Sequence, residues 1–361
     1  MASPESLKPS DPQEQARLLR VVKLLIGLVY LLLGALLLTP VLLRKGESLV
    51  AFFTPKPKEA TTAEKSNTDT VQYWLAADLF EEHDTIKLRE LQYGKELIAH
   101  TAQYLGPKGS VMAISNGMNC QNCHLDAGTR VFGNNYGSVA STYPKFRARS
   151  GSVESVFKRV NDCFERSLNG NILDSNSREL QAMIAYIQFI GKNVPKGKKA
   201  AGSGLKELGF LDRAADPKHG RLVYEGKCQS CHQANGEGQL QPDGVAYSFP
   251  PLWGSRSYND GAGLYRLSNF AKYVKYNMPQ GVHFDAPQLS DEEAWDVAAF
   301  VNSQPRPHKA TPSDWPDISK KPIDHPFGPY SDAFSEQQHK FGPFKPIEQA
   351  KKQYESLKKN S

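Results

Sequence analysis

Residues 119–128 read Asn-Cys-Gln-Asn-Cys-His-Leu-Asp-Ala-Gly and contain the pattern C-x-x-C-H, which returns at residues 228–232 as Cys-Gln-Ser-Cys-His. In this pattern the two thiols bind a haem covalently through its vinyl groups, and the histidine becomes the proximal iron ligand. Two patterns therefore predict two covalently bound haem c groups. Their attachment and proximal ligand residues are Cys120, Cys123, His124, Cys228, Cys231 and His232.

Helical patterns surround both motifs in the same order. An apolar-periodic stretch around residues 93–104 precedes the first motif, and an apolar stripe at residues 180–187 follows it. The second unit repeats the plan with a short helix near residues 220–224 and a last helix that Ser290 and Glu293 begin as a capping box. This order resembles the cytochrome c fold and predicts an all-α chain of two tandem cytochrome c domains.

Composition divides the chain further. The stretch from Leu24 to Leu43 carries no charge and is long enough to cross a bilayer as one helix, and a poor cleavage site follows it, so we expect an uncleaved N-terminal transmembrane anchor. A Pro-rich, aromatic C-terminal tail is expected to wrap over the domains. The predicted segments are 1–45 (stub and anchor), 46–72 (linker), 73–200 (first haem domain), 201–305 (second haem domain) and 306–361 (extended tail).

Charge and compartment limit the partners. The formal net charge of +6 over 361 residues suits small anions better than nucleic acid, for which no basic helix or aromatic RNA-binding motif is present. Basic residues flank the apolar stretch on both sides, so charge alone leaves its orientation open. Because haems of this type are attached outside the bacterial cytoplasm, we expect an inner-membrane anchor with the haem domains in the periplasm.

The distal ligand of the second haem is expected on the loop before the last helix. Met278 lies there, between Asn277 and Pro279, where cytochromes c place a thioether ligand. The alternatives are that Met278 only packs in the core and that His283, Lys272 or Lys275 binds the iron, or that the site stays open.

The first domain has no methionine on a comparable loop, but Cys163 lies at a comparable distance from its histidine. Cys163 is the one cysteine of five outside the two motifs, so no partner remains for a structural disulfide within the chain. A free cysteine is more often a buried, inert hydrophobe. The other reading is a functional thiol beside the first haem.

Positive charge surrounds this thiol. We expect a helix over residues 152–168 with Cys163 at the edge of a buried stripe that contains Val153, Phe157, Val160 and Phe164. Arginines beside a thiol favour the thiolate, which binds iron and attacks sulfur. A solvated face or contacts to haem propionates would also explain each arginine, but as a cluster they indicate a small dianionic substrate. The candidate residues are Arg147, Arg149, Arg159, Arg166 and Ser167.

Taken together, these blocks resemble the thiosulfate dehydrogenase family of dihaem c-type cytochromes. The block Asn-Asp-Cys-Phe-Glu-Arg-Ser around Cys163 is far more specific than C-x-x-C-H, which occurs in countless cytochromes. The similarity covers roughly residues 90–347. The matching stretches are 119–128, 143–149 (Tyr-Pro-Lys-Phe-Arg-Ala-Arg), 160–170, 328–332 and 341–344.

The resemblance implies an activity and a ligand set. Two thiosulfates are joined oxidatively into tetrathionate at a haem held by His124 and Cys163, and some members run the reverse reduction. Electrons leave through the second haem, held by His232 and Met278, to a cytochrome c or another redox protein. The resemblance also places Arg149, Arg159 and Ser167 in the substrate pocket.

Two departures from the family pattern stand out. Asn277 occupies the position where some relatives have a lysine, so a ligand switch at the second haem is not expected. Many relatives are soluble periplasmic proteins, whereas this chain carries the apolar N-terminal stretch.

Three other functions remain open on the sequence. A dihaem electron carrier would not consume thiosulfate by itself. A Sox-type sulfur-transfer subunit would need a carrier-protein partner. A dihaem peroxidase would keep one iron open and turn over peroxide.

Overall fold

The computed structural model describes residues 13, 19–33 and 71–359, and the chain divides into two compact units between Asp69 and Thr70. Residues 19–33 are helical. The rest of the expected apolar span, from residue 34 to Leu43, and the linker up to residue 70 lie outside the described residues. Among the residues that are described, no helix is both long and apolar enough to cross a membrane.

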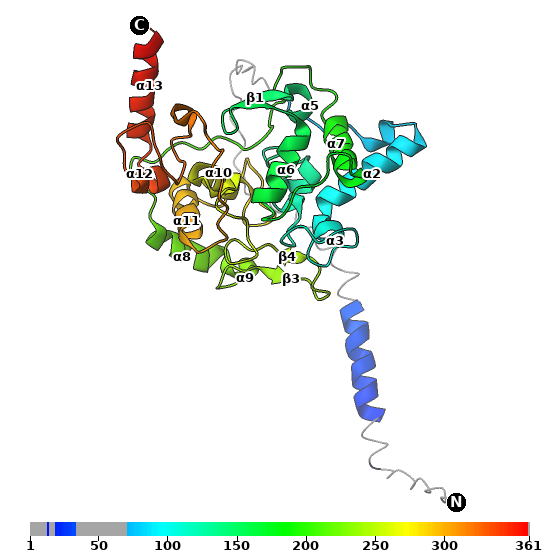
Figure 1. The fold of residues 1–361 in the computed structure, drawn as a ribbon. Coiled ribbons are helices and arrows are strands. Elements are labelled where there is room, and N and C mark those ends of the chain that lie inside the picture. Colours follow the sequence, from blue (N-terminus) through cyan, green and yellow to red (C-terminus); the bar gives the residue numbers. More distant parts are fainter. Residues whose placement is uncertain (1–12, 14–18, 34–70, 360–361) are drawn as a thin grey trace, which may run out of the picture. The chain divides into compact units, whose positions relative to one another are not determined.

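The larger unit, residues 71–359, holds both haem motifs in two helical domains (Figure 1). In the first domain, the opening and closing helices pack together around an apolar core that includes Leu97, Leu180 and Ile187. Its elements are η1 (Leu79–Glu81), α2 (Thr85–Ala99), α3 (Thr101–Leu105), η2 (Cys120–Asn122), α4 (Leu125–Gly128), α5 (Val139–Thr142), β1 (Lys145–Arg147), β2 (Ser152–Glu154), α6 (Val156–Arg166) and α7 (Arg178–Ile190).

The second domain repeats this arrangement with a separate core around Trp295 and Phe270. Its first helix begins with Pro217 at the first turn, where a missing N–H costs nothing, and its last helix has the capping box of Ser290 and Glu293, as predicted. The elements are α8 (Pro217–Lys227), α9 (Gln229–His232), β3 (Gln239–Leu240), β4 (Tyr247–Phe249), η3 (Gly263–Tyr265), α10 (Leu267–Asn277) and α11 (Asp291–Ser303).

A glycine allows close helix contact in each domain. Helices α2 and α7 pack together in the first domain, and α8 and α11 in the second. A Cβ atom on Gly94 would lie 2.0 Å from the carbonyl oxygen of Ala182, and one on Gly220 would lie 1.9 Å from that of Asp296. The equivalent positions of these two glycines show that the two domains are structural repeats.

Substitution of Gly220 by alanine is expected to destabilise the second domain. The added methyl group must push α8 away from α11, and overpacking of this kind costs roughly 1–3 kcal/mol. Gly226 on the same helix is the matched control, because a Cβ atom there meets nothing within 4 Å. Gly226→Ala should be neutral or stabilising by up to about 1 kcal/mol. Denaturant unfolding of the haem-loaded protein measures both changes, and equal stabilities would contradict the close-contact argument.

The all-α prediction was wrong in two small places, because two antiparallel hairpins interrupt the helices. Strand β1 pairs with β2, and β3 pairs with β4. The first hairpin also shortens the helix that was predicted over residues 152–168. Ser155 caps α6 at Val156, and Val153 is an exposed strand residue rather than part of the buried stripe.

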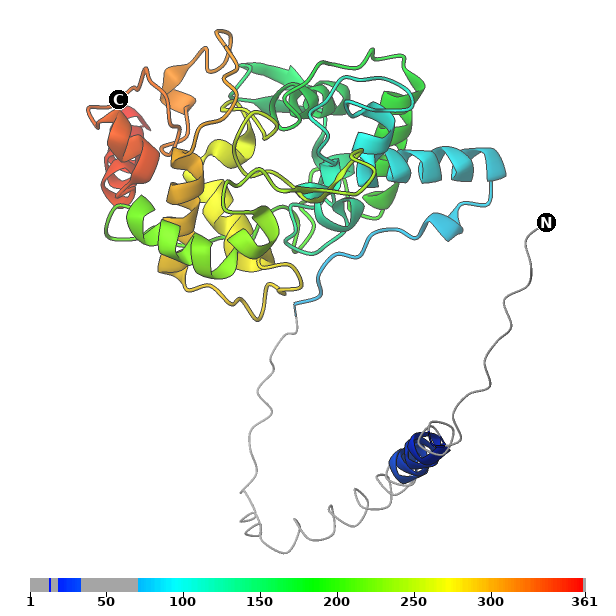
Figure 2. The ribbon, with the colours of Figure 1, turned by 90° about the horizontal axis from the view of Figure 1, so that it is seen from below.

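The C-terminal tail packs against the second domain. The backbone N–H of Ala215 donates to the carbonyl of Phe341, and the Phe344 ring is buried in the second core beside Trp295. Figure 2 shows the last two helices beside the second domain, on its side away from the first. These tail elements are η4 (Ile318–Lys320), α12 (Glu336–Phe341) and α13 (Lys345–Lys359).

Candidate functional site

The first attachment motif is tied to the opening helices of its domain. The short turn η2 contains Cys120, whose backbone N–H donates to the Thr101 hydroxyl at 3.0 Å. The side chain of Asn119 accepts a hydrogen bond from the backbone N–H of Ala102 at 2.8 Å. Both contacts are buried or nearly so, and they place this motif beside the junction where α2 ends and α3 begins.

The two motif histidines make the same kind of hydrogen bond, and it leaves the other ring nitrogen able to bind a metal. Nδ1 of His124 lies 2.5 Å from the carbonyl oxygen of Asn134, and Nδ1 of His232 lies 2.8 Å from that of Pro250. Each contact places the N–H on Nδ1 and leaves the Nε2 lone pair free. Burial lowers the pKa of His124 to about 4 and also lowers the pKa of His232, so both rings are neutral at ordinary pH.

The first motif opens into a cavity that Cys163 also lines. Its lining includes the motif residues Cys120, Cys123 and His124, and also Cys163 from helix α6. Two thiols, a neutral imidazole and apolar walls suit a haem c, and α6 brings a further sulfur, that of Cys163, to the same cavity. The apolar wall residues are Ile98, Met118, Tyr136, Val139, Val156, Val160, Phe164, Leu168, Met183 and Ile187.

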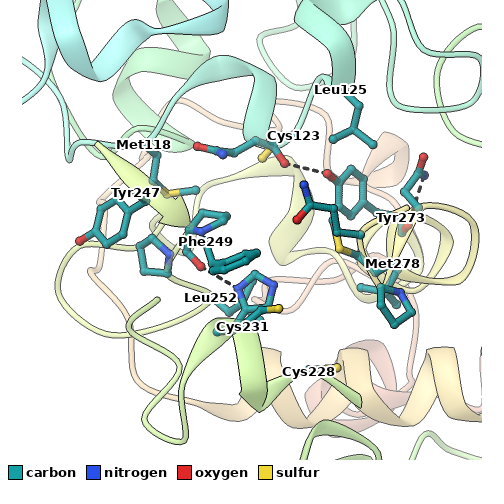
Figure 3. A pocket seen from close by; sticks show the side chains of 18 of the residues that line it. Met118, Cys123, Leu125, Cys228, Cys231, Tyr247, Phe249, Leu252, Tyr273 and Met278 are labelled. Atoms are coloured by element: carbon teal, nitrogen blue, oxygen red, sulfur yellow. Dashed lines mark hydrogen bonds between the residues drawn. The ribbon is translucent and has the colours of Figure 1, made fainter. Parts of the chain in front are cut away.

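The second motif lines a larger cavity of about 430 Å³ (Figure 3). Its lining includes Cys228, Cys231 and His232 together with Met278, which directly follows α10. The remaining wall is mainly apolar and aromatic, so this donor set also fits a haem c.

The other ligand candidates of the second domain are engaged elsewhere. Lys275 Nζ donates to the carbonyl of Leu289 and pairs with Asp291, and Lys272 pairs with Glu207. His283 is exposed and pairs with its neighbour Asp285. None of the three lines the cavity that contains His232, whereas Met278 does.

Cys163 has one close cationic neighbour. Arg159, one helical turn earlier on α6, places Nη1 at 3.3 Å from the Cys163 sulfur. Charge interaction with Cys163 raises the pKa of Arg159 above its usual value, so the guanidinium stays charged inside the cavity. Ser167, which caps α6, lines the same cavity. Fixed positive charge, a hydroxyl and a sulfur therefore meet at one place.

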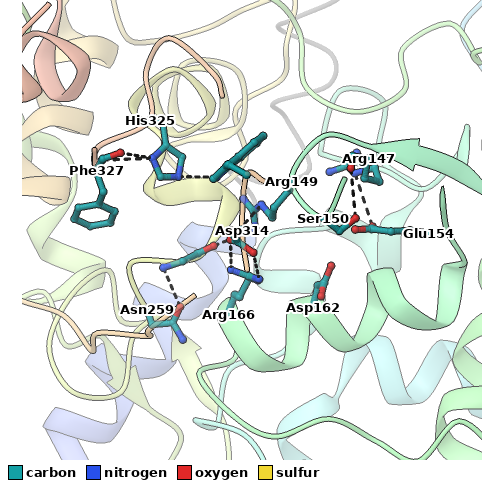
Figure 4. A network of polar contacts seen from close by, with 12 residues as sticks. Arg147, Arg149, Ser150, Glu154, Asp162, Arg166, Asn259, Asp314, His325 and Phe327 are labelled. Carbon is teal, nitrogen blue, oxygen red and sulfur yellow. Dashed lines mark hydrogen bonds and ion pairs between the residues drawn. The ribbon is translucent and has the colours of Figure 1, made fainter. Parts of the chain in front are cut away.

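Residues of the C-terminal tail contact two further arginines, Arg149 and Arg166 (Figure 4). Asp314 forms a two-pronged ion pair with Arg166, at 2.8 and 2.9 Å, and its carboxylate lies 4.0 Å from Nε of Arg149. The backbone N–H of Trp315 donates to the carbonyl of Arg149 at 2.6 Å, and the indole ring lies 5.7 Å from its guanidinium carbon. The tail thus holds both side chains in place.

Arg149 faces a third, polar cavity of about 170 Å³. Burial, with the neighbouring Arg166 as a further cause, lowers the pKa of Arg149 to about 10, so it remains a cation at neutral pH. Burial also lowers the pKa of His325 to about 4, which leaves that ring neutral. The polar residues lining this cavity are Arg149, Asp260, Arg266, His308, Lys309, Thr311, Asp314 and His325.

The predicted site residues therefore fall into separate places. Arg159 and Ser167 lie with Cys163, while Arg149 lies at the polar cavity and Arg166 is occupied by Asp314. Arg147 is on strand β1, where its Nε lies 3.9 Å from the buried carboxylate of Glu154, and it does not line the Cys163 cavity. Arg147 ends β1, whereas Arg149 lies in the turn between β1 and β2, so the two side chains lie in different places although they are only two residues apart.

Sequence reasoning missed the part played by the tail. Asp314, Trp315 and His325 surround Arg149, although nearly 150 residues separate Asp314 from its partner Arg166. The only feature of the sequence that pointed to these residues was the unusual density of aromatic residues in a segment without helical periodicity.

Family profiles match both halves of the larger unit. Residues 111–195 match the SoxA/TsdA cytochrome c domain, and residues 217–305 match the cytochrome c family.

Individual proteins extend this similarity. The chain is 42% identical over 198 residues to a thiosulfate dehydrogenase of Allochromatium vinosum, covering 54% of this chain and 72% of that protein. It is 38% identical over 206 residues to one from Psychrobacter arcticus, covering 56% of this chain and 61% of that protein. A solved thiosulfate dehydrogenase, TsdBA of Marichromatium purpuratum, superposes with a TM-score of 0.61 at 29% identity, covering 69% of this chain and 52% of that one.

Proposed function

This chain belongs to the thiosulfate dehydrogenase family of dihaem c-type cytochromes, and we propose that it joins two thiosulfate dianions into tetrathionate at Cys163. The observation that carries the proposal is the contact of 3.3 Å between Arg159 and the only cysteine outside the attachment motifs, in the cavity that the first motif lines. A simple electron carrier needs neither the thiol nor the half-buried cation beside it.

The Cys163 sulfur takes part in two bond-forming steps. Its thiolate first forms an S–S bond with the sulfane sulfur of one thiosulfate, and this step releases two electrons. A second thiosulfate then attacks that sulfane sulfur, which forms the new S–S bond of tetrathionate and expels the Cys163 thiolate. Two dianions become one dianion and two electrons, and no proton is consumed.

Charge repulsion is the main obstacle to this reaction. Two unit charges at 4 Å repel by roughly 4 kcal/mol at an effective dielectric near 20, and each thiosulfate carries two charges. Arg159 neutralises the anion bound at Cys163, and the Ser167 hydroxyl supplies a further donor there. Arg149, held by the tail at the polar cavity, is placed to attract the second anion, with Lys309 beside it. Arg166 has only an indirect role in binding the anions in this proposal, because its guanidinium is already paired with Asp314.

When bound, the two haems supply the one-electron acceptors for the electrons released. Cys163 is proposed as the distal ligand of the first and Met278 as that of the second, which their positions in the two cavities support. A thiolate ligand lowers and a thioether ligand raises a haem potential, so this ligand pair favours electron flow from the first site to the second. A cytochrome c or another redox protein is the proposed final acceptor.

We also propose that the apolar stretch beginning at Leu24 anchors the chain in the inner membrane, with the haem domains in the periplasm. The absence of charge from Leu24 to Leu43 supports this placement, as does the site of haem attachment in bacteria.

A direct assay tests the proposed activity. The purified, haem-loaded protein is mixed with thiosulfate and ferricyanide, and tetrathionate is measured by chromatography. We expect one tetrathionate for every two thiosulfates and two ferricyanides consumed. Thiosulfate consumption only after addition of a sulfur-carrier protein would instead indicate a Sox-type sulfur-transfer subunit, and no consumption at all would indicate an electron carrier.

A further inference from the structure

The two haem sites meet across one helix. The cavity of about 430 Å³ that contains the second motif is also lined by Cys123 of the first motif. Tyr273 on α10 lies between them, and Figure 3 shows its ring directed at the backbone next to Cys123. Helix α10 ends at Asn277, and Met278, the proposed sulfur ligand of the second site, follows directly, so the helix that positions Met278 also touches the first site's attachment loop.

The Tyr273 contact is short and buried. Its hydroxyl donates to the carbonyl of Asn122, the residue before Cys123, at 2.7 Å. The Tyr273 side chain is 4% exposed. Burial raises the pKa of this phenol well above its usual value, so it remains a hydrogen-bond donor at every ordinary pH.

Asn277 adds a second contact one turn later. Its side-chain amide donates to the carbonyl of Phe132 in the first domain and to that of Tyr273 in its own helix, both at 3.2 Å. Asn277 is 2% exposed and directly precedes Met278. The Phe132 ring packs against Phe284 of the second domain at a centroid distance of 5.0 Å, so the accepting loop is itself held at the domain boundary.

We propose that Tyr273 and Asn277 are positioning residues that clamp α10 to the attachment loop of the first haem, and that electron transfer between the two sites crosses this clamp. The clamp sets the place of Met278 relative to the first site. It also places a hydrogen bond, instead of an empty gap, between α10 and Asn122, the residue before Cys123. Electron tunnelling slows steeply with each added ångström of empty gap, so this contact affects rate as well as structure.

The proposal rests on the proposed function only in requiring both haems. Its test therefore supplies electrons from a chemical or photochemical reductant instead of thiosulfate. A failure of the thiosulfate assay would leave this measurement unaffected, and the reverse also holds.

The test compares two tyrosine variants of the full, haem-loaded chain. Tyr273→Phe removes only the hydroxyl that reaches the first domain. Tyr276→Phe is the matched control, since it lies on the same helix and is also buried, but its hydroxyl donates at 3.0 Å to the carbonyl of Glu207 within the second domain. After a rapid one-electron reduction, the rate of electron redistribution between the two haems is followed by absorbance.

We expect Tyr273→Phe to slow this redistribution several-fold while Tyr276→Phe leaves it unchanged, with equal haem content in both. Asn277→Ala should in addition weaken the ferric methionine-to-iron charge-transfer band and lower the second midpoint potential, because Met278 loses its anchored neighbour. A Tyr273→Phe rate equal to wild type would overturn the proposal. Equal slowing in both tyrosine variants would overturn it too, since that result means general loosening of α10.

Discussion

Replacement of Cys163 by alanine is expected to abolish tetrathionate formation while both haems remain attached. The variant keeps Cys120, Cys123 and His124 and loses only the sulfur that forms the S–S bond with thiosulfate. Loss of a covalent nucleophile leaves only binding and electrostatic contributions, so we expect a fall in kcat on the order of 10³-fold or more. The thiosulfate–ferricyanide assay measures the rate, and a haem stain of the denatured chain measures attachment.

Cys163→Ser is the companion variant, because a hydroxyl preserves size and polarity but cannot form the sulfur–sulfur bond. Both variants should also change the spectrum of the first haem and leave that of the second unchanged, since Met278 lies in a different cavity. Retention of most of the activity in either variant, with the spectral change present, would sink the covalent role and leave Cys163 as a ligand only.

Arg159→Gln is expected to cause the next largest loss. It removes the charge 3.3 Å from the Cys163 sulfur, in a half-buried position that Gln leaves without a cation. Removal of one preorganised electrostatic donor typically costs roughly 10²- to 10³-fold in kcat. Arg159→Lys should recover only part of this, because an ammonium lacks the planar fork of the guanidinium.

Arg178→Gln is the matched control for this change. Arg178 lies on α7 in the same domain, has a mostly exposed side chain and does not line the Cys163 cavity. This variant removes the same net charge, so its activity should match wild type at any ionic strength. A similar loss in both variants would mean that Arg159 acts through the overall field of the protein, which contradicts a local role.

Much of this fold could be predicted because its signals are local. The spacing of C-x-x-C-H, the capping box at Ser290 and the apolar period of the closing helices all lie within a few turns of chain. The two small hairpins could not, because strands of two or three residues have no measurable period. Ser152 to Glu154 looked like the start of α6, and only their pairing with residues 145–147 makes them a strand.

The site was predictable to a smaller extent. Arg159 and Ser167 lie one turn before and one turn after Cys163, so helix geometry alone places them beside it. Arg147 and Arg149 were both candidates, with only Arg149 placed in the substrate pocket by the family resemblance, and the structure puts Arg147 near Glu154 and Arg149 at the polar cavity. Their orientations follow from the hairpin and from the tail, which local pattern does not describe.

The sequence by itself determined that two haems are attached, that one spare thiol lies beside arginines, and that the chain repeats one helical plan. These properties depend on covalent spacing and helical period, and both can be read along the chain. Only the tertiary structure decided that Asp314 holds Arg166 and that Tyr273 reaches the loop of the first haem. Such contacts join residues far apart in sequence, and the packing of separate elements around a shared core sets them.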